Sequence, residues 1–373
     1  MNDAPAAASR VTLRVRLAPR GIGLIVIATE AVLGGALLYD ERLISLGLVG
    51  LLGVFAGWIA AAWNARGLSV SRRVPGRASA GAGFPVTVAV HNEKRWLAAR
   101  RIDVRDALLP ADDPGFSADP VPPGESRAAS FRAVAMKRGV ISAARFRVSS
   151  RFPLGLFEAS GEGELRAGIL VRPRPAPPPR EAMRLIHDRE PGELSGVREH
   201  RPGDPFKLVH WAATARSSRL IIRDLDSPTP APLAILFHSC AAPGAILQQG
   251  PFETALQIAA GALERAAKLG IPITFAAGFA GWRPVRSADA ALDALAAAIY
   301  APEPRPEAFA AAALHCIPSG ARALILSDRP LAEWRGIVPP LRCPAVLLDP
   351  AGAEVVRPRM RFGASVAAGA GQA

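Results

Sequence analysis

The chain has 373 residues, half of them hydrophobic, which is enough for about two or three domains with sizeable cores. Its formal net charge is +13, but only four of the 45 cationic residues are lysines, and alanine, glycine and proline are also abundant. This pattern indicates a general composition bias rather than a selected basic patch. Because aromatic residues for base stacking are also few, the composition argues against nucleic-acid binding. The three cysteines, Cys240, Cys316 and Cys343, do not have the spacing of metal ligands.

Two apolar segments, residues 21–39 and 43–63, are each long enough to cross the hydrocarbon layer of a membrane as a helix. Only Asp40-Glu41-Arg42 separates them, so we expect a tight transmembrane hairpin over residues 21–63. Four arginines precede it and four follow it, namely Arg10, Arg14, Arg16, Arg20, Arg66, Arg72, Arg73 and Arg77. The positive-inside rule then places both flanks in the cytosol. We expect a protein of the cell (inner) membrane with two spans, residues 1–20 as a cytoplasmic tail and the main domains in the cytosol.

Glu30 lies near the middle of the first apolar segment. A carboxylate at that depth is costly unless it is neutral or paired, so a functional role and a protonated side chain packed near Gly34-Gly35 both stay open. Gly53 and Gly57, four residues apart, predict a close-packing face on the second segment.

Residues 67–175 consist of short runs in which apolar and polar residues alternate, separated by glycine and proline. Alternation with a period of two is typical of half-buried strands. The clearest such runs are residues 84–91, 101–106, 130–134, 144–148 and 169–172. Several short strands without a long helix predict a β-sandwich domain. The proline-rich stretch 173–179 predicts an extended connector.

The densest polar segment of the chain is residues 193–226. Residues 197–200 predict a short strand, residues 201–204 a tight turn and residues 219–223 a returning strand. Asp204 followed by Pro205 predicts a helix start, because the carboxylate can cap free amides and proline is favoured in the first turn. We expect that helix to run to about Ala215.

This segment resembles the family called domain of unknown function 58. The matching positions are Arg198, His200, Pro202, Gly203, Asp204, Lys207, His210, Trp211, Ala215 and Arg216. Arg138-Gly139 and residues 152–157 are also similar to the family, with Leu154 as a mild departure. The resemblance implies a membrane-anchored protein that partners a MoxR-type AAA+ ATPase, often beside a transglutaminase-like membrane protein. It implies an adaptor or assembly factor without a cofactor, and not an enzyme.

After a linker-and-signature region at residues 176–230, residues 231–350 alternate buried strands with helices. The predicted strands are residues 233–237, 273–277, 323–326 and 345–348. Such alternation predicts a parallel sheet covered by helices on both faces. The family resemblance implies that this α/β domain is von Willebrand factor A-like, or Rossmann-like in the wider sense. Residues 351–373 predict a flexible tail.

Two possible chemical sites follow from these residues. The A-like domain normally binds a divalent cation through an Asp-x-Ser-x-Ser loop, but this chain has His238-Ser239-Cys240 there, and Asp328 alone cannot hold the ion. We therefore expect a degenerate site without a metal.

The alternative of a hydrolase rests on His210 as a base and Asp204 as its orienting carboxylate, which are six residues apart and do not naturally face one another on a helix. Residues 193–226 carry six cations and five carboxylates. That near-balance favours an internal ion-pair network over a ligand site or a catalytic centre.

Overall fold

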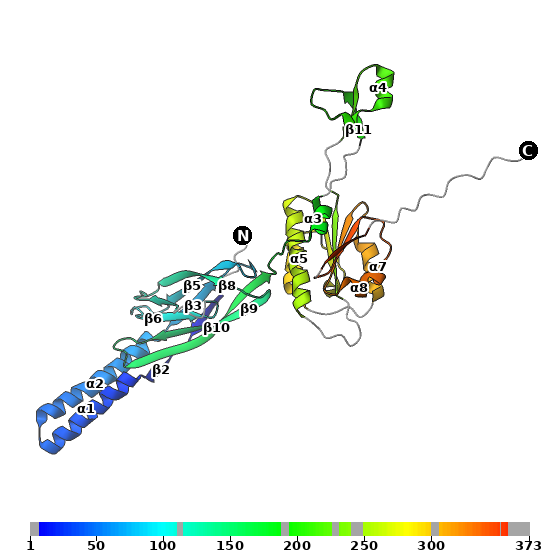
Figure 1. The fold of residues 1–373 in the computed structure, drawn as a ribbon. Helices are drawn as coiled ribbons and strands as arrows, with labels where there is room; N and C mark the ends of the chain where they lie inside the picture. The colour runs from blue at the N-terminus through cyan, green and yellow to red at the C-terminus, as the bar shows by residue number, and fades with distance from the viewer. Residues whose placement is uncertain are drawn as a thin grey trace, which may run out of the picture. The chain divides into compact units, whose positions relative to one another are not determined.

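The computed structural model describes residues 7–109, 115–187, 194–225, 231–239, 249–299, 306–350 and 352–356 (Figure 1). The chain divides into two compact units, Met1–Arg172 and Pro173–Ala373. The division falls at the start of the proline-rich stretch that the sequence predicts as a connector.

The N-terminal unit contains the predicted helical hairpin, with α1 over Pro19–Leu38 and α2 over Glu41–Asn64. Both helices are long and apolar enough to cross a membrane. Asp40 is the N-cap of α2. Its carboxylate accepts hydrogen bonds from the backbone N–H groups of Arg42 and Leu43 at 2.8 and 3.3 Å. These bonds satisfy free amides of the first turn of α2. The predicted hairpin is therefore present as two helices with a capped turn.

Glycine lets the two helices approach closely at two positions. A Cβ atom at Gly35 would lie 2.8 Å from the backbone nitrogen of Ile44, and one at Gly47 would lie 2.5 Å from the carbonyl oxygen of Ala28. Such distances leave no room for a side chain, so these glycines form the contact between α1 and α2.

The glycines that were predicted to pack the helices together do not lie at this contact. Gly34 and Gly53 face open space, and Gly57 faces Leu156 of the β domain rather than α1. The prediction of a Gly53–Gly57 packing face is therefore wrong for the hairpin contact, because the rotation of α2 turns Gly47 toward α1. Glu30 lies on the exposed side of α1.

Two sheets form the rest of this unit (Figure 1). The first has the order β1-β3-β5-β8, with β1 (Ala7–Val11), β3 (Leu68–Arg73), β5 (Gly83–Asn92) and β8 (Ser126–Val134). The second has the order β2-β10-β9-β6-β7, with β2 (Arg14–Leu17), β10 (Phe157–Arg172), β9 (Gly139–Ser150), β6 (Ile102–Asp106), β7 (Phe116–Ala118) and β4 (Arg77–Ser79) beside β10. Four of the five predicted strands fall within these elements, and the fifth, residues 101–106, begins one residue before β6. Alternate residues of the strands are buried, and both sheets contribute to one apolar core.

The predicted cytoplasmic tail, residues 1–20, is partly structured. Strand β1 pairs with β3 in one sheet, and β2 pairs with β10 in the other. The tail prediction is wrong for residues 7–17. Val11, Leu13, Val15 and Leu17 alternate with polar residues, as is typical of a strand, and the strands are held by partners distant in sequence. The helical hairpin is consequently an insertion between two strands of the same domain.

A buried ion pair joins the two sheets. Arg72 of β3 is 2 % exposed and Asp106 of β6 is 3 % exposed, and Nε of Arg72 donates to Oδ2 of Asp106 at 2.8 Å. The same guanidinium donates to the carbonyl oxygens of Leu165 in β10 and Ala144 in β9, at 3.1 and 3.2 Å. The backbone N–H of Leu108 donates to the second carboxylate oxygen of Asp106 at 2.9 Å. Arg72 is therefore part of the core, and its place among the cations flanking the spans was wrongly predicted.

The C-terminal unit contains a five-stranded sheet of order β14-β13-β15-β16-β17. Its strands are β13 (Leu233–His238), β14 (Ile273–Ala277), β15 (Arg322–Ser327), β16 (Ala345–Leu348) and β17 (Ala353–Val356). The first four are parallel, as the strand–helix alternation predicts, and β17 adds an antiparallel edge. Strand β17 shows that the predicted flexible tail, residues 351–373, begins with a paired segment at residues 353–356.

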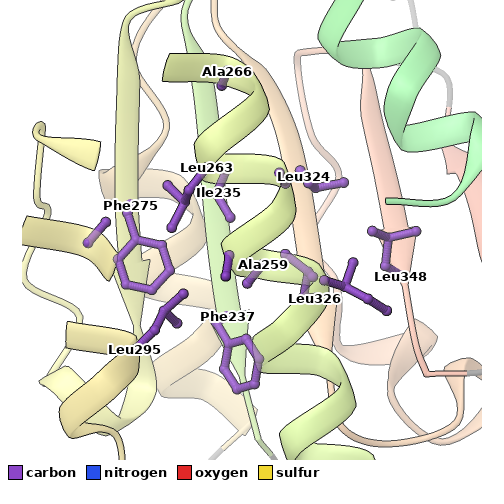
Figure 2. Close-up of a cluster of buried hydrophobic side chains, with 14 of the residues drawn as sticks. Ile235, Phe237, Ala259, Leu263, Ala266, Phe275, Leu295, Leu324, Leu326 and Leu348 are labelled. Carbon is purple, nitrogen blue, oxygen red and sulfur yellow. The ribbon is translucent and has the colours of Figure 1, made fainter. Parts of the chain in front are cut away.

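Helices cover both faces of this sheet. The bounds are α3 (Arg180–His187), α5 (Gln249–Lys268), α6 (Ala288–Ala297), α7 (Pro306–Cys316), α8 (Leu331–Trp334), η2 (Gly278–Ala280) and η3 (Arg335–Ile337). Figure 2 shows the core on one face, where Ile235 and Phe237 of β13 lie against α5. Phe309 of α7 and Trp334 of α8 belong to the core of the opposite face. This arrangement is a three-layer α/β domain.

Residues 176–230 were predicted to be a linker with the signature motif. Helix α3, which lies within that range, belongs instead to the α/β domain. Its residues Leu185 and Ile186 lie in the core, and the carbonyl oxygen of Leu185 accepts a hydrogen bond from Nη1 of the buried Arg322 at 2.8 Å. The backbone N–H of Ala176 also donates to the carbonyl oxygen of Gln257 in α5 at 2.9 Å. The signature segment is therefore an insertion between α3 and β13.

We expect Asp106→Ala to destabilise the N-terminal unit by about 3–5 kcal/mol, because it leaves the Arg72 guanidinium buried without its counter-charge. Urea unfolding in detergent, followed by circular dichroism, measures the loss. The matched control is Glu158→Ala, which breaks the exposed pair with Arg151 and should cost less than about 1 kcal/mol. Combining Arg72→Met with Asp106→Leu should recover most of the loss. Equal effects of Asp106→Ala and Glu158→Ala would contradict the structural role of the buried pair.

In the hairpin, we expect Gly35→Leu or Gly47→Leu to destabilise the helix pair by about 1–3 kcal/mol through overpacking. Gly34→Leu and Gly53→Leu are matched controls, since a side chain at either position meets open space. Thermal melting of the detergent-solubilised protein distinguishes the two sets. If Gly53→Leu is as damaging as Gly47→Leu, the helix contact described here is incorrect.

Candidate functional site

The signature residues form a small hairpin, which we call the signature module and define as residues 194–225. Strands β11 (Leu194–Glu199) and β12 (Ile221–Leu225) pair in antiparallel fashion. Between them lie a turn with Gly203 at φ 103°, a 3-10 turn η1 (Phe206–Leu208) and helix α4 (Trp211–Ser217). Val209 and Ile222 are buried and form an antiparallel bridge. Both predicted strands and the predicted turn are confirmed.

The predicted helix from Pro205 to about Ala215 is interrupted. Val209 is extended, and the backbone N–H of His210 donates to the carbonyl oxygen of Ile221 in β12 at 2.8 Å. That bond ties the chain to the hairpin in the middle of the predicted helix. A new helix, α4, then begins, and Nδ1 of His210 accepts from the backbone N–H of Ala213 at 3.1 Å. His210, not Asp204, is the residue that caps a helix here.

Asp204 is held by Arg198 across the turn. Nη1 and Nη2 of Arg198 donate to the two carboxylate oxygens of Asp204 at 2.7 and 2.8 Å, and the backbone N–H of Arg201 donates at 2.8 Å. These hydrogen bonds, first from Arg198 and then from Arg201, hold the pKa of Asp204 far below its ordinary value. Ion pairs are present in the module, with Arg198 bound to Asp204 and Arg219 bound to Glu199. The predicted tight turn at residues 201–204 could have indicated the pairing of Arg198 with Asp204, because such a turn brings the residues before it close to those at its end.

The bulkiest apolar residues of the module are exposed. Phe206 is 68 % exposed and Trp211 is 67 % exposed. The His200 ring stacks on Phe206 with their centroids 5.6 Å apart. Among the other matching positions of the signature, five are exposed, namely Pro202, Gly203, Lys207, Ala215 and Arg216, and four are half-buried, namely Arg198, His200, Asp204 and His210. The module therefore leaves most of the signature positions exposed around a very small core.

His210 and Asp204 are each occupied by a local structural bond. The Nδ1 atom of His210 is bound to α4, and the carboxylate of Asp204 is bound to Arg198. A catalytic base needs its orienting carboxylate within hydrogen-bond reach. The described residues show no hydrogen bond between His210 and Asp204, so the geometry of the signature module resembles a structural network rather than a catalytic pair.

The second candidate site lies at the carboxyl edge of the α/β sheet. Because β13 and β15 are parallel neighbours, the residues that follow them, Ser239 and Asp328, come together there, as is typical of the ligand-binding crevice of such sheets. Oγ of Ser239 donates to Oδ2 of Asp328 at 2.8 Å, and both residues are buried. Cys240 lies outside the described residues. Within the described ranges, no group of three or more His, Cys, Asp or Glu residues could hold a metal ion.

His238 precedes this edge and is fully buried. Its ring centroid lies 4.2 Å from that of Phe309 and 4.5 Å from that of Trp334, both edge-on. Neither ring nitrogen has a hydrogen-bond partner among the residues described. Burial lowers the pKa of His238 to about 4, while a weaker interaction with its own main chain acts in the opposite direction. His238 is therefore neutral near pH 7 and behaves as a core residue.

No model of a known protein family matches the chain, and no curated protein matches it either. The resemblance to the domain of unknown function 58 family therefore rests on the signature residues and stays a prediction.

We expect the α/β unit to lose stability as the pH falls from about 6.5 to about 4, because the unfolded chain protonates His238 where the folded domain does not. The loss should reach roughly 3 kcal/mol and level off below about pH 4. Urea midpoints at several pH values measure it. His238→Leu should flatten this dependence, whereas the exposed control His315→Gln should retain it. An unchanged slope in His238→Leu would contradict the assignment.

Proposed function

We propose that this protein is a membrane-anchored adaptor or assembly factor that acts through protein–protein contacts with a MoxR-type AAA+ ATPase. The observation that carries the proposal is the signature module, which holds Phe206 and Trp211 in solvent on a scaffold fixed by Arg198 and Asp204. Exposed tryptophan and arginine next to a rigid backbone are typical of the residues that dominate protein–protein binding energy. The ATP chemistry belongs to the partner. A transglutaminase-like membrane protein is a further partner that the family resemblance suggests.

The membrane topology in this proposal is a hairpin with both ends in the cytosol. The insertion of α1 and α2 between two strands of one domain supports it, because both helix ends must then lie on the side of that domain. Arg14, Arg16 and Arg20 precede the hairpin and Arg66 and Arg73 follow it, which favours the cytosolic side even without Arg72. In this proposal the sandwich and the α/β unit lie in the cytosol.

We further infer that the α/β domain is von Willebrand factor A-like with a metal site that has lost its function. The direct hydrogen bond between Ser239 and Asp328 supports this, since Ser239 occupies Oδ2 of the carboxylate at the position where an ion would otherwise be held. The residues present do not amount to the oxygen-rich ligand set that magnesium requires. We expect partner binding without a metal.

A hydrolase using His210 and Asp204 is the competing class. The helix-capping bond of His210 and the Arg198 pair of Asp204 favour the adaptor, because both groups would have to break existing bonds to act on a substrate. Nucleic-acid binding is disfavoured by the near-balance of charge in the signature segment.

To test the adaptor role, Trp211→Ala and Phe206→Ala are combined with a binding assay against a MoxR-type ATPase of the same cell. Each should weaken binding by at least about tenfold, as expected for interface anchors, while unfolding stability changes by less than about 0.5 kcal/mol because both rings are exposed. Met136→Ala, which removes an exposed apolar side chain from the sandwich unit, is the matched control and should bind normally.

Two outcomes would count against the adaptor. Unchanged affinity in both variants would remove the signature module from the interface. Loss of a measurable turnover in His210→Ala, with stability retained, would favour the hydrolase instead.

A further inference from the structure

A cavity of about 370 Å³ lies in the N-terminal unit where α2 ends and the β domain begins. It is lined by residues from the end of α2 and the connection to β3, and by the loop that follows β5. Its lining includes Trp63, Arg66, Lys94, Arg95, Trp96 and Leu97. Its volume is within the range of pockets that hold small ligands.

Buried asparagines fix both walls of this cavity. Nδ2 of Asn64, on the last turn of α2, donates to the carbonyl oxygen of Arg100 and to Oγ of Ser150, both at 2.9 Å. Nδ2 of Asn92 donates to the carbonyl oxygen of Leu97 at 2.9 Å, and its Oδ1 accepts from the backbone N–H of Lys94 at 3.2 Å. The end of the helix and the loop at residues 93–97 are therefore held in place before any ligand arrives.

The cavity has an excess of positive charge. The Arg66 guanidinium lies 5.6 Å from the centroid of the Trp63 ring, and Nζ of Lys94 donates to the carbonyl oxygen of Asn64 at 2.9 Å. Burial lowers the pKa of Lys94 to about 8, so an anionic ligand would favour its charged form. Among the described residues, the carboxylate lining the cavity is Glu93, which pairs with Arg10 at 3.1 Å. Arg66, Lys94 and Arg95 consequently leave net positive charge for an anion.

The rim of the cavity is apolar and exposed. Trp96 is 87 % exposed, Leu97 is 51 % exposed and Trp63 is 52 % exposed. Tryptophan is favoured at the level of lipid headgroups, where its ring contacts acyl chains and its N–H contacts polar groups. The exposed apolar side chains of the loop at residues 93–97, beside the end of α2, fit that environment.

We propose that this cavity binds the phosphate headgroup of an anionic phospholipid in the membrane that α1 and α2 cross, with Trp96 and Leu97 lying in the interfacial layer. The inference rests on the membrane-anchoring part of the proposed function. A lipid explains the combination of cationic lining and exposed apolar rim, whereas a soluble anion would make no use of the rim. Because the cavity adjoins the last turn of α2, the bound headgroup would belong to the leaflet in which α2 ends.

The test uses the full-length protein in nanodiscs of equal parts phosphatidylglycerol and phosphatidylcholine. After release into detergent, bound lipids are counted by native mass spectrometry. The wild type should retain phosphatidylglycerol preferentially. Replacing Arg66, Lys94 and Arg95 together with glutamine should reduce that retention by at least about tenfold, since each cation near an anionic surface contributes about 1 kcal/mol. The charge-matched control replaces Arg132, Arg145 and Arg166, which are exposed elsewhere on the sheets, and should retain the lipid.

Because Lys94 also bonds to the main chain of α2, the double variant Arg66→Gln with Arg95→Gln provides a second measurement in which that bond is kept. It should show an intermediate reduction. Trp96→Phe should in addition lose part of the fluorescence quenching caused by brominated phosphatidylcholine. Equal retention by wild type and both variants would overturn the headgroup site. Displacement of the lipid by inorganic phosphate, but not by chloride at equal ionic strength, would show a site for soluble anions and overturn the lipid assignment.

Failure of the membrane anchor has a separate signature. Alkaline carbonate washing of native membranes should leave the wild type and the triple variant in the pellet. Release of the wild type would overturn the anchor itself, whereas retention without any preference for phosphatidylglycerol would overturn the headgroup site alone.

Discussion

The ion pair between Arg72 and Asp106 is the interaction on which the N-terminal unit most depends. A guanidinium in an apolar core is costly unless every donor is directed at an acceptor, and here the acceptors come from β6, β9 and β10. The pair therefore fixes β3 against the opposite sheet. Because β3 begins four positions after α2 ends, it also fixes where the helical hairpin leaves the β domain.

Both segments to which we assign a function are insertions into a rigid domain. The hairpin α1–α2 lies between β2 and β3, and the signature module lies between α3 and β13. An insertion is tied at both ends, so its supporting domain can be stable without it and can present it to another surface. This explains how a module with a core as small as Val209 and Ile222 can keep Phe206 and Trp211 exposed.

The polar residues that suggest catalysis are used for local structure. His210 caps α4, Asp204 binds Arg198, and Ser239 binds Asp328. His210 and Asp204 are bound by residues nearby in the chain, and Oδ2 of Asp328 is bound by the residue that follows an adjacent strand. The surfaces that remain open are the exposed aromatic side chains of the signature module and the cationic cavity at the foot of α2. We propose that the first recognises a protein and the second a lipid.

The sequence by itself determined the two apolar helices, the alternating strands of the β domain and the strand–helix alternation of the α/β domain. Those features depend on contacts between near neighbours, which repeat with periods of 3.6 and 2 residues. The tertiary structure alone decided that the strands in residues 7–17 pair with β3 and β10, that Arg72 is buried and that α3 belongs to the α/β core. It also decided that Arg72 pairs with Asp106, 34 residues away. Such pairings follow from the order of strands in a sheet, and a single sequence carries no local periodic signal for that order.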